Sequence, residues 1–256
     1  MFELKKDEMH KIIPLCEGNE QSDVWACIQG YMGKAFVDEI DNPKCAKLLV
    51  ADFCYLFGCA SDNETAKEMV IQLQEDCKGK IIDAKDKKWG MLIEEIYEKQ
   101  YRKFNRYTMK ADMEAFDIEK LRLYAENIPG IYSMKRIDEE LYHKVFEKEW
   151  TLDLCSNFSS PDDFLSNGIG YVVVLDGEIV SGASSYSRSQ NSIDITIGTE
   201  QEHRRKGLAL ACASKLILEC LQQNICPGWE AANADSVALA EKLGYTFIGE
   251  YPVYMI

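Results

Sequence analysis

The sequence predicts a mixed α/β (α+β) fold on the basis of three observations. Short runs rich in β-branched residues alternate with longer apolar helical runs throughout residues 169–251. The N-terminal half is richer in helical patterns, but its segment 46–57 is apolar and aromatic enough to predict a strand closed by Gly58. Between the two halves, Pro129 and Gly130 interrupt any helix and mark a domain boundary.

This boundary divides the chain into two expected domains of similar length. Residues 1–128 form an N-terminal α/β domain, and residues 129–256 form a second domain with the more regular pattern. Besides the strand at 46–57, the elements expected in the first domain are helices over 7–13, 20–32, 87–100 and 117–127, a helix from Asn63 or Glu64 to Gln74, and a strand over 106–110.

The second domain opens with a strand and two helices that carry clear start signals. A strand pattern covers 131–137, and Asp138 is expected to cap a helix over 139–154. Pro161 stands near the first position of a short helix that begins after Ser160.

A hairpin follows these helices. Asp176 and Gly177 are the strongest hairpin signal in the chain, and strand patterns cover 169–175 before them and 178–186 after them. A polar turn then leads to a third strand over 192–198, in which apolar and polar residues alternate.

A basic turn joins this third strand to the next helix. Arg204, Arg205 and Lys206 precede Gly207, and an apolar helical run covers 208–221. The start of a helix leaves backbone N–H groups unpaired and carries partial positive charge. Gly207 lets the backbone approach an anion closely, and the three cations add to the charge. In a chain whose formal net charge is −14, this local excess of positive charge predicts a site for a phosphorylated ligand.

The chain ends with a strand, a capped helix and a final strand. Residues 227–232 predict a short strand, and Asn233 or Asp235 caps a helix that ends at Gly244. The last strand is expected over 246–251.

Two motifs in this half resemble those of the GNAT superfamily of N-acetyltransferases. The pattern Arg204-x-x-Gly207-x-Ala209 is similar to the acetyl-CoA signature of the superfamily, and the segment from Trp229 to Tyr245 is similar to its second motif. The order of strands and helices around the motifs is also that of the GNAT fold. Within the superfamily, the second motif and the long N-terminal extension most resemble the branch that includes the zwittermicin A resistance acetyltransferase.

The resemblance implies acetyl-CoA as the cofactor. Its thioester carbonyl is expected at a backbone N–H of a splayed strand, and its diphosphate at the basic turn and helix start. Asn233 either binds the pantetheine amides or only caps its helix. No metal is expected. The residues expected to contact the cofactor are Ile195, Thr196, Ile197, Arg204, Arg205, Lys206, Gly207, Leu208, Ala209, Asn233 and Ser236.

Acetyl transfer to an amine also requires a base and an acid. Asp194 and Glu230 are the candidate bases, and Asp194 is preferred because GNAT bases often lie on its strand. Many GNAT enzymes protonate the departing thiolate with a tyrosine in the second motif, but the corresponding residue here is Ala240. Ser236, and Tyr251 or Tyr254 near the C-terminus, are the candidates to replace that tyrosine; the alternative is that the thiolate leaves unassisted.

The N-terminal half allows two interpretations. Its strands and the helix near 63–76 faintly echo the order of the second half, as a degenerate, non-catalytic GNAT-like repeat would. The alternative is an unrelated α+β extension, because no pattern like Arg-x-x-Gly-x-Ala occurs before residue 204.

Composition excludes several classes of protein. A net charge of −14 argues against a nucleic-acid or anionic-membrane partner and favours a cationic acceptor such as an amine. The ten cysteines are scattered without a C-x-x-C pair, so free and mostly buried thiols are expected rather than disulfides or a metal site. The absence of an apolar signal core and of any long apolar stretch predicts a cytoplasmic protein.

These observations predict an acetyl-CoA-dependent N-acetyltransferase that acts on a primary amine of a small molecule. An amino-bearing antibiotic or metabolite is the specific acceptor suggested by the zwittermicin-type resemblance. The alternative is a non-catalytic acyl-CoA-binding sensor or interaction module, because the usual tyrosine acid is missing at Ala240. The chain is expected to be a monomer or a homodimer.

Overall fold

The computed structural model describes residues 1–60 and 64–256. The expected helix start at Asn63 lies outside these ranges, whereas the alternative start at Glu64 is observed. In the described ranges, no helix is long and apolar enough to span a bilayer.

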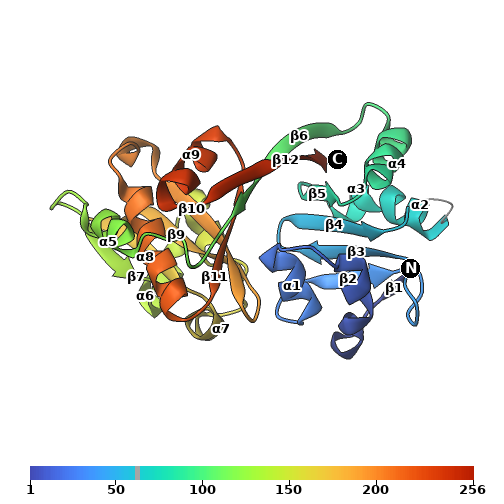
Figure 1. Ribbon diagram of the computed structural model, residues 1–256, viewed down its shortest axis with the longest axis horizontal. Helices are drawn as coiled ribbons and strands as arrows, with labels where there is room; N and C mark the ends of the chain where they lie inside the picture. Colours follow the sequence, from blue (N-terminus) through green and yellow to red (C-terminus); the bar gives the residue numbers. More distant parts are fainter. Residues whose placement is uncertain (61–63) are drawn as a thin grey trace. The chain divides into compact units, whose positions relative to one another are not determined.

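The chain forms two compact units, drawn in Figure 1. Unit 1 consists of Met1–Arg106 and Glu250–Ile256, and unit 2 consists of Tyr107–Gly249. Unit 2 begins before the boundary expected at Pro129, because α5 (Ile118–Glu126) packs against α8 (Leu208–Gln222), the helix that follows the basic turn.

Unit 1 contains both helices and strands.

The segment expected as one strand over 46–57 is a hairpin of two strands, so that prediction was wrong. Ala51 adopts a φ of 48° in its turn, a conformation uncommon outside glycine, and the apolar pattern around it gives no sign of the reversal. The elements are β1 (Phe2–Glu3), the 3-10 helix η1 (Lys6–Cys16), α1 (Ser22–Ile28), β2 (Lys34–Val37), β3 (Cys45–Val50), β4 (Phe53–Gly58), α2 (Glu64–Ile71), α3 (Leu73–Asp76), β5 (Ile81–Ala84) and α4 (Lys87–Tyr97).

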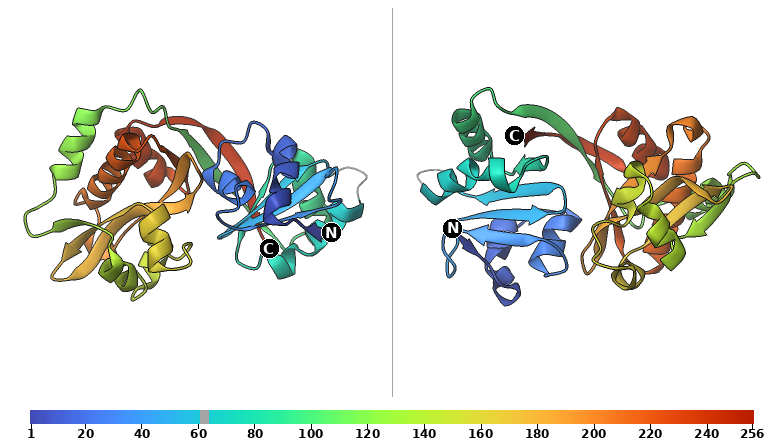
Figure 2. Two further views of the ribbon diagram at one scale, coloured as in Figure 1. Left: turned by 90° about the horizontal axis from the view of Figure 1, so that it is seen from below. Right: turned by 180° about the vertical axis from the view of Figure 1, so that it is seen from behind.

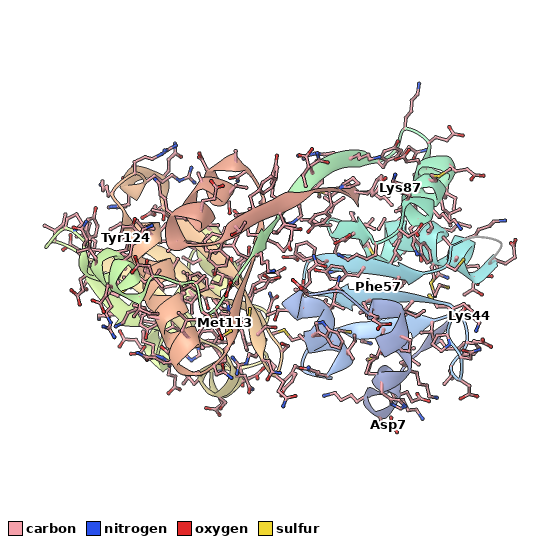
Figure 3. The ribbon with its side chains drawn as sticks, in the orientation of Figure 1. Asp7, Lys44, Phe57, Lys87, Met113 and Tyr124 are labelled. Atoms are coloured by element: carbon pink, nitrogen blue, oxygen red, sulfur yellow. The ribbon has the colours of Figure 1, made fainter. Side chains whose placement is uncertain are left out.

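The strands of unit 1 form a sheet in the order β1-β2-β3-β4-β5, and the end of β12 (Thr246–Met255) pairs with β5. Strands β1 to β4 are antiparallel, and β5 is parallel to β4. Alternation along β4 buries Phe57 (labelled in Figure 3) in a core with η1 and α1, and Leu56 in a second core with α2, α3 and α4. The sheet of unit 1 is therefore covered on both faces.

Unit 2 also mixes helices and strands, which confirms the fold class. One expected helix, over 139–154, is instead two shorter ones, because the Thr151 hydroxyl bonds to the Val145 and Lys148 carbonyls at the break. The elements are the end of β6 (Arg102–Lys110), α5, β7 (Ser133–Arg136), α6 (Glu139–Val145), the 3-10 helix η2 (Glu149–Leu154), α7 (Pro161–Asn167), β8 (Gly170–Leu175), β9 (Glu178–Arg188), β10 (Ser192–Thr199), the 3-10 helix η3 (Gln201–His203), α8, β11 (Cys226–Ala231), α9 (Ala234–Leu243) and the start of β12.

The predicted helix caps of unit 2 are confirmed. The Asp138 carboxylate accepts a hydrogen bond from the Leu141 N–H at 2.9 Å and starts α6. Asn233, not Asp235, caps α9, and its side-chain oxygen accepts from the Ser236 N–H at 3.0 Å. Gly244 ends α9 with a φ of 113°.

The sheet of unit 2 has the strand order β7-β8-β9-β10-β11-β6. Strands β7 to β10 are antiparallel, β11 is parallel to β10, and β6 is antiparallel to β11. Helices α5, α8 and α9 cover one face (Figure 2), where Leu121, Leu216 and Leu243 share a core. The other face carries η2, whose Leu154 packs at Gly182.

The two units repeat one order of elements. In unit 1, β2, β3 and β4 are antiparallel, α2 and α3 follow, β5 is parallel to β4, and α4 and β6 come next. In unit 2 the same places are taken by β8, β9, β10, α8, β11, α9 and β12. The last strands are exchanged, because β6 pairs with β11 inside unit 2 and β12 pairs with β5 inside unit 1.

Candidate functional site

The basic turn after β10 is an open, left-handed turn at a helix start. Arg205 has a φ of 61° and Gly207, which begins α8, a φ of 80°. A Cβ built on Gly207 would meet no atom within 4 Å, so the space over the turn is empty of protein. The N–H groups of the first turn of α8 have no partner within the helix, and the helix dipole adds positive charge. The turn can therefore hold an anion.

The three cations surround this turn in different ways. Arg204 and Arg205 are exposed: the first donates to the Thr199 carbonyl at 3.2 Å and the second lies 3.5 Å from the Asp235 carboxylate. Lys206 donates from Nζ to the Tyr132 hydroxyl at 3.2 Å. Two solvent-facing guanidinium groups thus remain close to the anion site, whereas the lysine helps to hold the turn.

The sequence interpretation missed Tyr132. Its side chain is 7% exposed, and its hydroxyl lies 2.9 Å from His203 Nδ1 as well as near Lys206. Tyr132 therefore connects the segment before β7 to the basic turn. The sequence places Tyr132 within the strand expected over 131–137, and nothing in that pattern indicates a contact with the basic turn.

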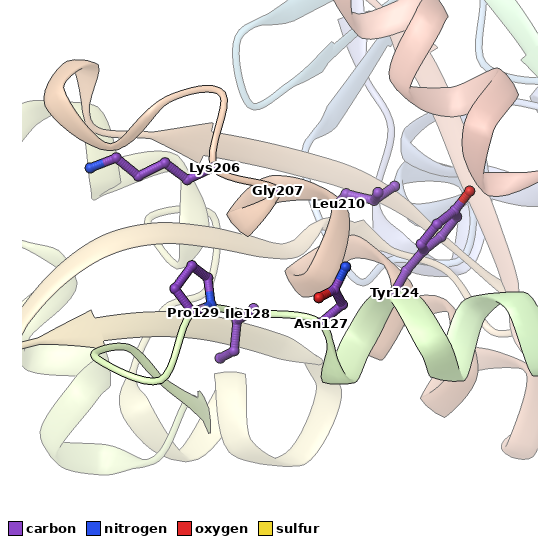
Figure 4. A pocket seen from close by; sticks show the side chains of 7 residues that line it. All are labelled: Tyr124, Asn127, Ile128, Pro129, Lys206, Gly207 and Leu210. Carbon is purple, nitrogen blue, oxygen red and sulfur yellow. The ribbon is translucent and has the colours of Figure 1, made fainter.

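A cavity of about 240 Å³ lies beside the turn (Figure 4). One side is the start of α8, and the other is the end of α5 with the segment that follows it. The residues that line it are Tyr124, Asn127, Ile128, Pro129, Lys206, Gly207 and Leu210. The sequence did not predict this cavity, because no periodic pattern shows that α5 packs against α8.

Strands β10 and β11 pair only along part of their length. In the part of the chain that the structure describes, their register joins Ser192–Asp194 to residues 226–228 and then stops. A register shift between Asp194 and Ile195 marks an irregularity of β10 at the same point. Ile195, Thr196 and Ile197 follow it, still paired with β9 on their other edge. One edge of β10 is therefore open at the residues predicted to face the thioester.

Asp194 and Glu230, the candidate bases, lie on the same face of the sheet. Alternation directs Ile193 and Trp229 into the core under α8 and α9, so their neighbours Asp194 and Glu230 face the opposite side. Gly228 lies level with Asp194, and a Cβ there would lie only 3.3 Å from Asp194 Oδ1. The absent side chain leaves room beside the carboxylate.

The remaining predicted residues fall in different places. Ser236 lies in the first turn of α9, where its hydroxyl accepts from the Trp229 indole N–H at 3.1 Å. Ala240 is fully buried. Tyr251 belongs to unit 1, where its hydroxyl accepts from the Gln21 amide at 3.4 Å and its ring lies 5.4 Å from Lys85 Nζ. Unit 2 therefore holds every predicted site residue except Tyr251 and Tyr254, which both belong to unit 1.

Burial sets the ionisation of the deepest groups near the site. The Tyr245 side chain is buried, and burial raises its pKa well above the ordinary value, with the nearby Asp194 charge adding to the effect. Its hydroxyl donates to the Pro227 carbonyl at 2.8 Å. Burial also raises the pKa of the Cys212 thiol to about 12. Neither group is suited to release a proton at neutral pH.

Known proteins share both the sequence and the fold. Residues 13–254 match the family described as GNAT acetyltransferase. A GCN5-related N-acetyltransferase-like protein from Streptococcus suis is 34% identical, with 97% of this chain and 98% of that chain covered and a TM-score of 0.88. A tandem GNAT protein from the clavulanic acid biosynthesis pathway has a TM-score of 0.61 at 12% identity, over 98% of this chain and 96% of its own, which shows a shared fold.

A curated relative covers less of the molecule. The uncharacterized N-acetyltransferase YdfB of Bacillus subtilis is 30% identical over 135 residues, which span 50% of this chain and 49% of that protein. The match over residues 13–254 and the similarity to the Streptococcus suis protein cover nearly the whole chain. The chain belongs to the GNAT acetyltransferase family.

Proposed function

We propose that this protein transfers an acetyl group from acetyl-CoA to a primary amine of a small molecule. The observation that carries the proposal is the position of the open turn at Gly207, which directly follows a strand whose edge is unpaired beyond Asp194. A turn that can hold an anion would bind the diphosphate of a nucleotide-linked thioester, and the open strand edge would bind its thioester arm. Family membership supplies the reaction class.

The cofactor would lie along β10 with its diphosphate on the basic turn. The N–H groups of Arg205, Lys206, Gly207, Leu208 and Ala209 would bind the diphosphate, with Arg204 adding charge. The pantetheine arm would pair with the open edge of β10, and Asn233 and Ser236 at the start of α9 would contact it. A backbone N–H among Ile195, Thr196 and Ile197 would polarise the thioester carbonyl, an interaction worth about 3 kcal/mol in acyl transfer.

The face that carries Asp194 and Glu230 would receive the acceptor. An alkylamine has a pKa of about 10, so it must lose a proton before it attacks the thioester carbon. One of these carboxylates would take that proton, directly or through water. The amine nitrogen then bonds to the carbonyl carbon, the C–S bond breaks, and the thiolate takes a proton from Ser236 or from solvent, since Ala240 has none to give.

The finer assignments are part of the same proposal. Unit 2 would form the catalytic domain and unit 1 a non-catalytic one, in a cytoplasmic monomer or homodimer. The net charge of −14 favours a cationic acceptor. The zwittermicin-type resemblance makes amino-bearing antibiotics the first acceptors to screen, with polyamines and amino sugars as comparison.

Calorimetric titration of acetyl-CoA into three proteins tests the cofactor site. We expect micromolar binding to the wild type and loss of binding in Gly207→Glu, because a carboxylate would occupy the anion site. Gly177→Glu is the matched control, since Gly177 also has a positive φ (86°) and open space around it, but lies in the β8–β9 turn. It should bind as the wild type does, with equal folding of both variants checked by thermal melting.

Three results would count against the proposal. No binding of acetyl-CoA or CoA to the wild type would remove the cofactor site, and equal loss in both glutamate variants would make the effect one of strain. Binding without transfer to any amine of the panel would favour the acyl-CoA-binding sensor instead.

A further inference from the structure

The cavity beside the basic turn is not accounted for by the acetyl-transfer chemistry. Its lining includes Lys206 and Gly207 of the turn, but Tyr124, Asn127 and Pro129 come from the segment that connects the two repeated sets of elements. This segment belongs to neither GNAT-like motif. Figure 4 shows these side chains on both sides of one space at the start of α8.

The lining has the chemistry of a site for a planar heterocycle. Tyr124 offers a half-buried aromatic ring, and Ile128, Pro129 and Leu210 offer apolar surface. Aromatic side chains in nucleic-acid-binding proteins stack on bases in this way. At about 240 Å³, the cavity lies below the range that holds a whole drug-sized ligand, so it would hold one ring system rather than an entire cofactor.

The polar groups at the cavity match the edge of adenine. The Asn127 side-chain amide is exposed and makes no hydrogen bond to any other described residue. An asparagine amide can accept from the N6 amino group of adenine and donate to N7 at once.

We propose that this cavity binds the adenine base of acetyl-CoA, with Tyr124 stacking on the ring and Asn127 pairing with its edge. The inference rests on the proposed function. Gly207 lines the cavity and also begins the helix that would hold the diphosphate, so the base and the diphosphate would lie on adjacent sides of one residue. The Lys206 ammonium is held by Tyr132, which directs its charge away from the base.

Titrations with two thioesters test this subsite. Acetyl-CoA contains the base, whereas S-acetyl-4′-phosphopantetheine keeps the reactive arm and one phosphate but lacks the nucleoside. Tyr124→Leu should raise the Kd of acetyl-CoA about tenfold, within the range of base–aromatic stacking, and leave the Kd of the shorter thioester unchanged. Tyr124→Phe should bind both ligands as the wild type does. Asn127→Ala should raise the Kd of acetyl-CoA alone by about threefold to tenfold.

Leu123→Ala is the matched control. Leu123 neighbours Tyr124 on α5, is 65% exposed and does not line the cavity, so this variant should bind both thioesters normally. Equal weakening of both thioesters by Tyr124→Leu, or no weakening of either, would overturn the adenine subsite while leaving the acetyltransferase proposal intact. Failure of the wild type to bind either thioester would instead remove the proposed function.

Discussion

Units 1 and 2 share one order of elements, but within the described residues the glycine that closes β4 in unit 1 is closely packed, whereas the glycine before α8 in unit 2 is open. Gly58 closes β4 with a φ of 80°, as Gly207 does before α8, yet a Cβ on Gly58 would lie 2.2 Å from the Lys44 carbonyl oxygen. The Gly58 backbone packs against its own unit, whereas Gly207 faces empty space. The same conformation therefore serves packing in one unit and is available to a ligand in the other.

The parallel strand pairs β4–β5 of unit 1 and β10–β11 of unit 2 also differ, because only the first is paired along a whole strand. In unit 1, all four residues of β5 pair with β4, from Phe53 to Leu56. Tyr55 and Asp83 are neighbours in this register, and Lys85 forms an ion pair with Asp83 and lies over the Tyr55 ring. In unit 2, the pairing of β10 with β11 stops after Asp194. The parallel pair is therefore complete along β5 in unit 1 and incomplete along β11 in unit 2.

Among variants that test the difference between the units, the largest expected effect is a loss of catalysis when the candidate base of unit 2 is replaced. Asp194→Asn or Glu230→Gln, whichever removes the base, should lower kcat by about 10²- to 10⁴-fold at neutral pH, and activity should rise again at high pH where the amine loses its proton unaided. Steady-state kinetics across pH measure this. Asp83→Asn, the carboxylate variant of unit 1, should lower the melting temperature but keep kcat. A folded Asp83→Asn protein that loses activity as severely would end the distinction between the units.

The second effect is on the free energy of unfolding, which should fall further when Gly58 is replaced by alanine than when Gly207 is. Gly58→Ala should lower the free energy of unfolding by about 2–5 kcal/mol, because the Cβ meets backbone and the φ is unfavourable. Gly207→Ala carries only the cost of the conformation, about 1–2 kcal/mol. Denaturant titration of both variants compares them. Equal losses would mean that the open space at Gly207 is filled in solution.

A smaller effect is expected from Tyr132→Phe. The change removes the hydroxyl that receives Lys206 and contacts His203, while the ring stays in the core. One lost hydrogen bond is worth about 0.5–1.5 kcal/mol, so the Kd of acetyl-CoA should rise by about twofold to tenfold. Calorimetry measures the shift, and Tyr107→Phe is a comparison at a partly buried tyrosine of the same unit. An unchanged Kd in Tyr132→Phe would show that the basic turn keeps its shape without this contact.

The smallest effects concern pH, and two carboxylates, one in each unit, should respond in opposite directions. Burial raises the pKa of Asp23 in unit 1 despite the hydrogen bond from the Tyr55 hydroxyl. For Glu219 in unit 2, burial acts to raise the pKa, but the hydrogen bonds from Arg136 and Tyr171 outweigh it, so its pKa is lowered. A raised carboxyl pKa costs stability as pH rises above the unfolded value of about 4, whereas a lowered one adds stability that is lost on acidification.

Substitution of each carboxylate isolates its contribution. Asp23→Asn should flatten the decline in unfolding free energy above about pH 4, and Glu219→Gln should flatten the loss below about pH 5. Denaturant titrations of both variants between about pH 3 and pH 7 measure the two slopes. If the unfolding free energy of a variant depends on pH as that of the wild type does, the replaced carboxylate does not have the shifted pKa given above.

Local sequence signals predicted the elements of unit 2 more fully than those of unit 1. The Asp176–Gly177 turn, the caps at Asp138 and Asn233, and the stop at Gly244 were each readable because a single side chain determines the backbone there. The hairpin at Ala51 could not be predicted, because the positive φ of Ala51 is imposed by the pairing of β3 with β4 and not by its residue type. The break within 139–154 was equally hidden, since it depends on where the Thr151 hydroxyl finds its acceptors.

The sequence by itself determined most of the order of strands and helices in unit 2, the basic turn at the start of α8, and the family. These depend on periodicity, capping and short motifs, which act between residues close in the chain. Only the tertiary structure decided that β6 and β12 are exchanged between the repeats, that Tyr132 holds Lys206, and that α5 and α8 enclose a cavity. Each of these joins residues far apart in the chain, and packing between distant segments leaves no periodic trace in a single sequence.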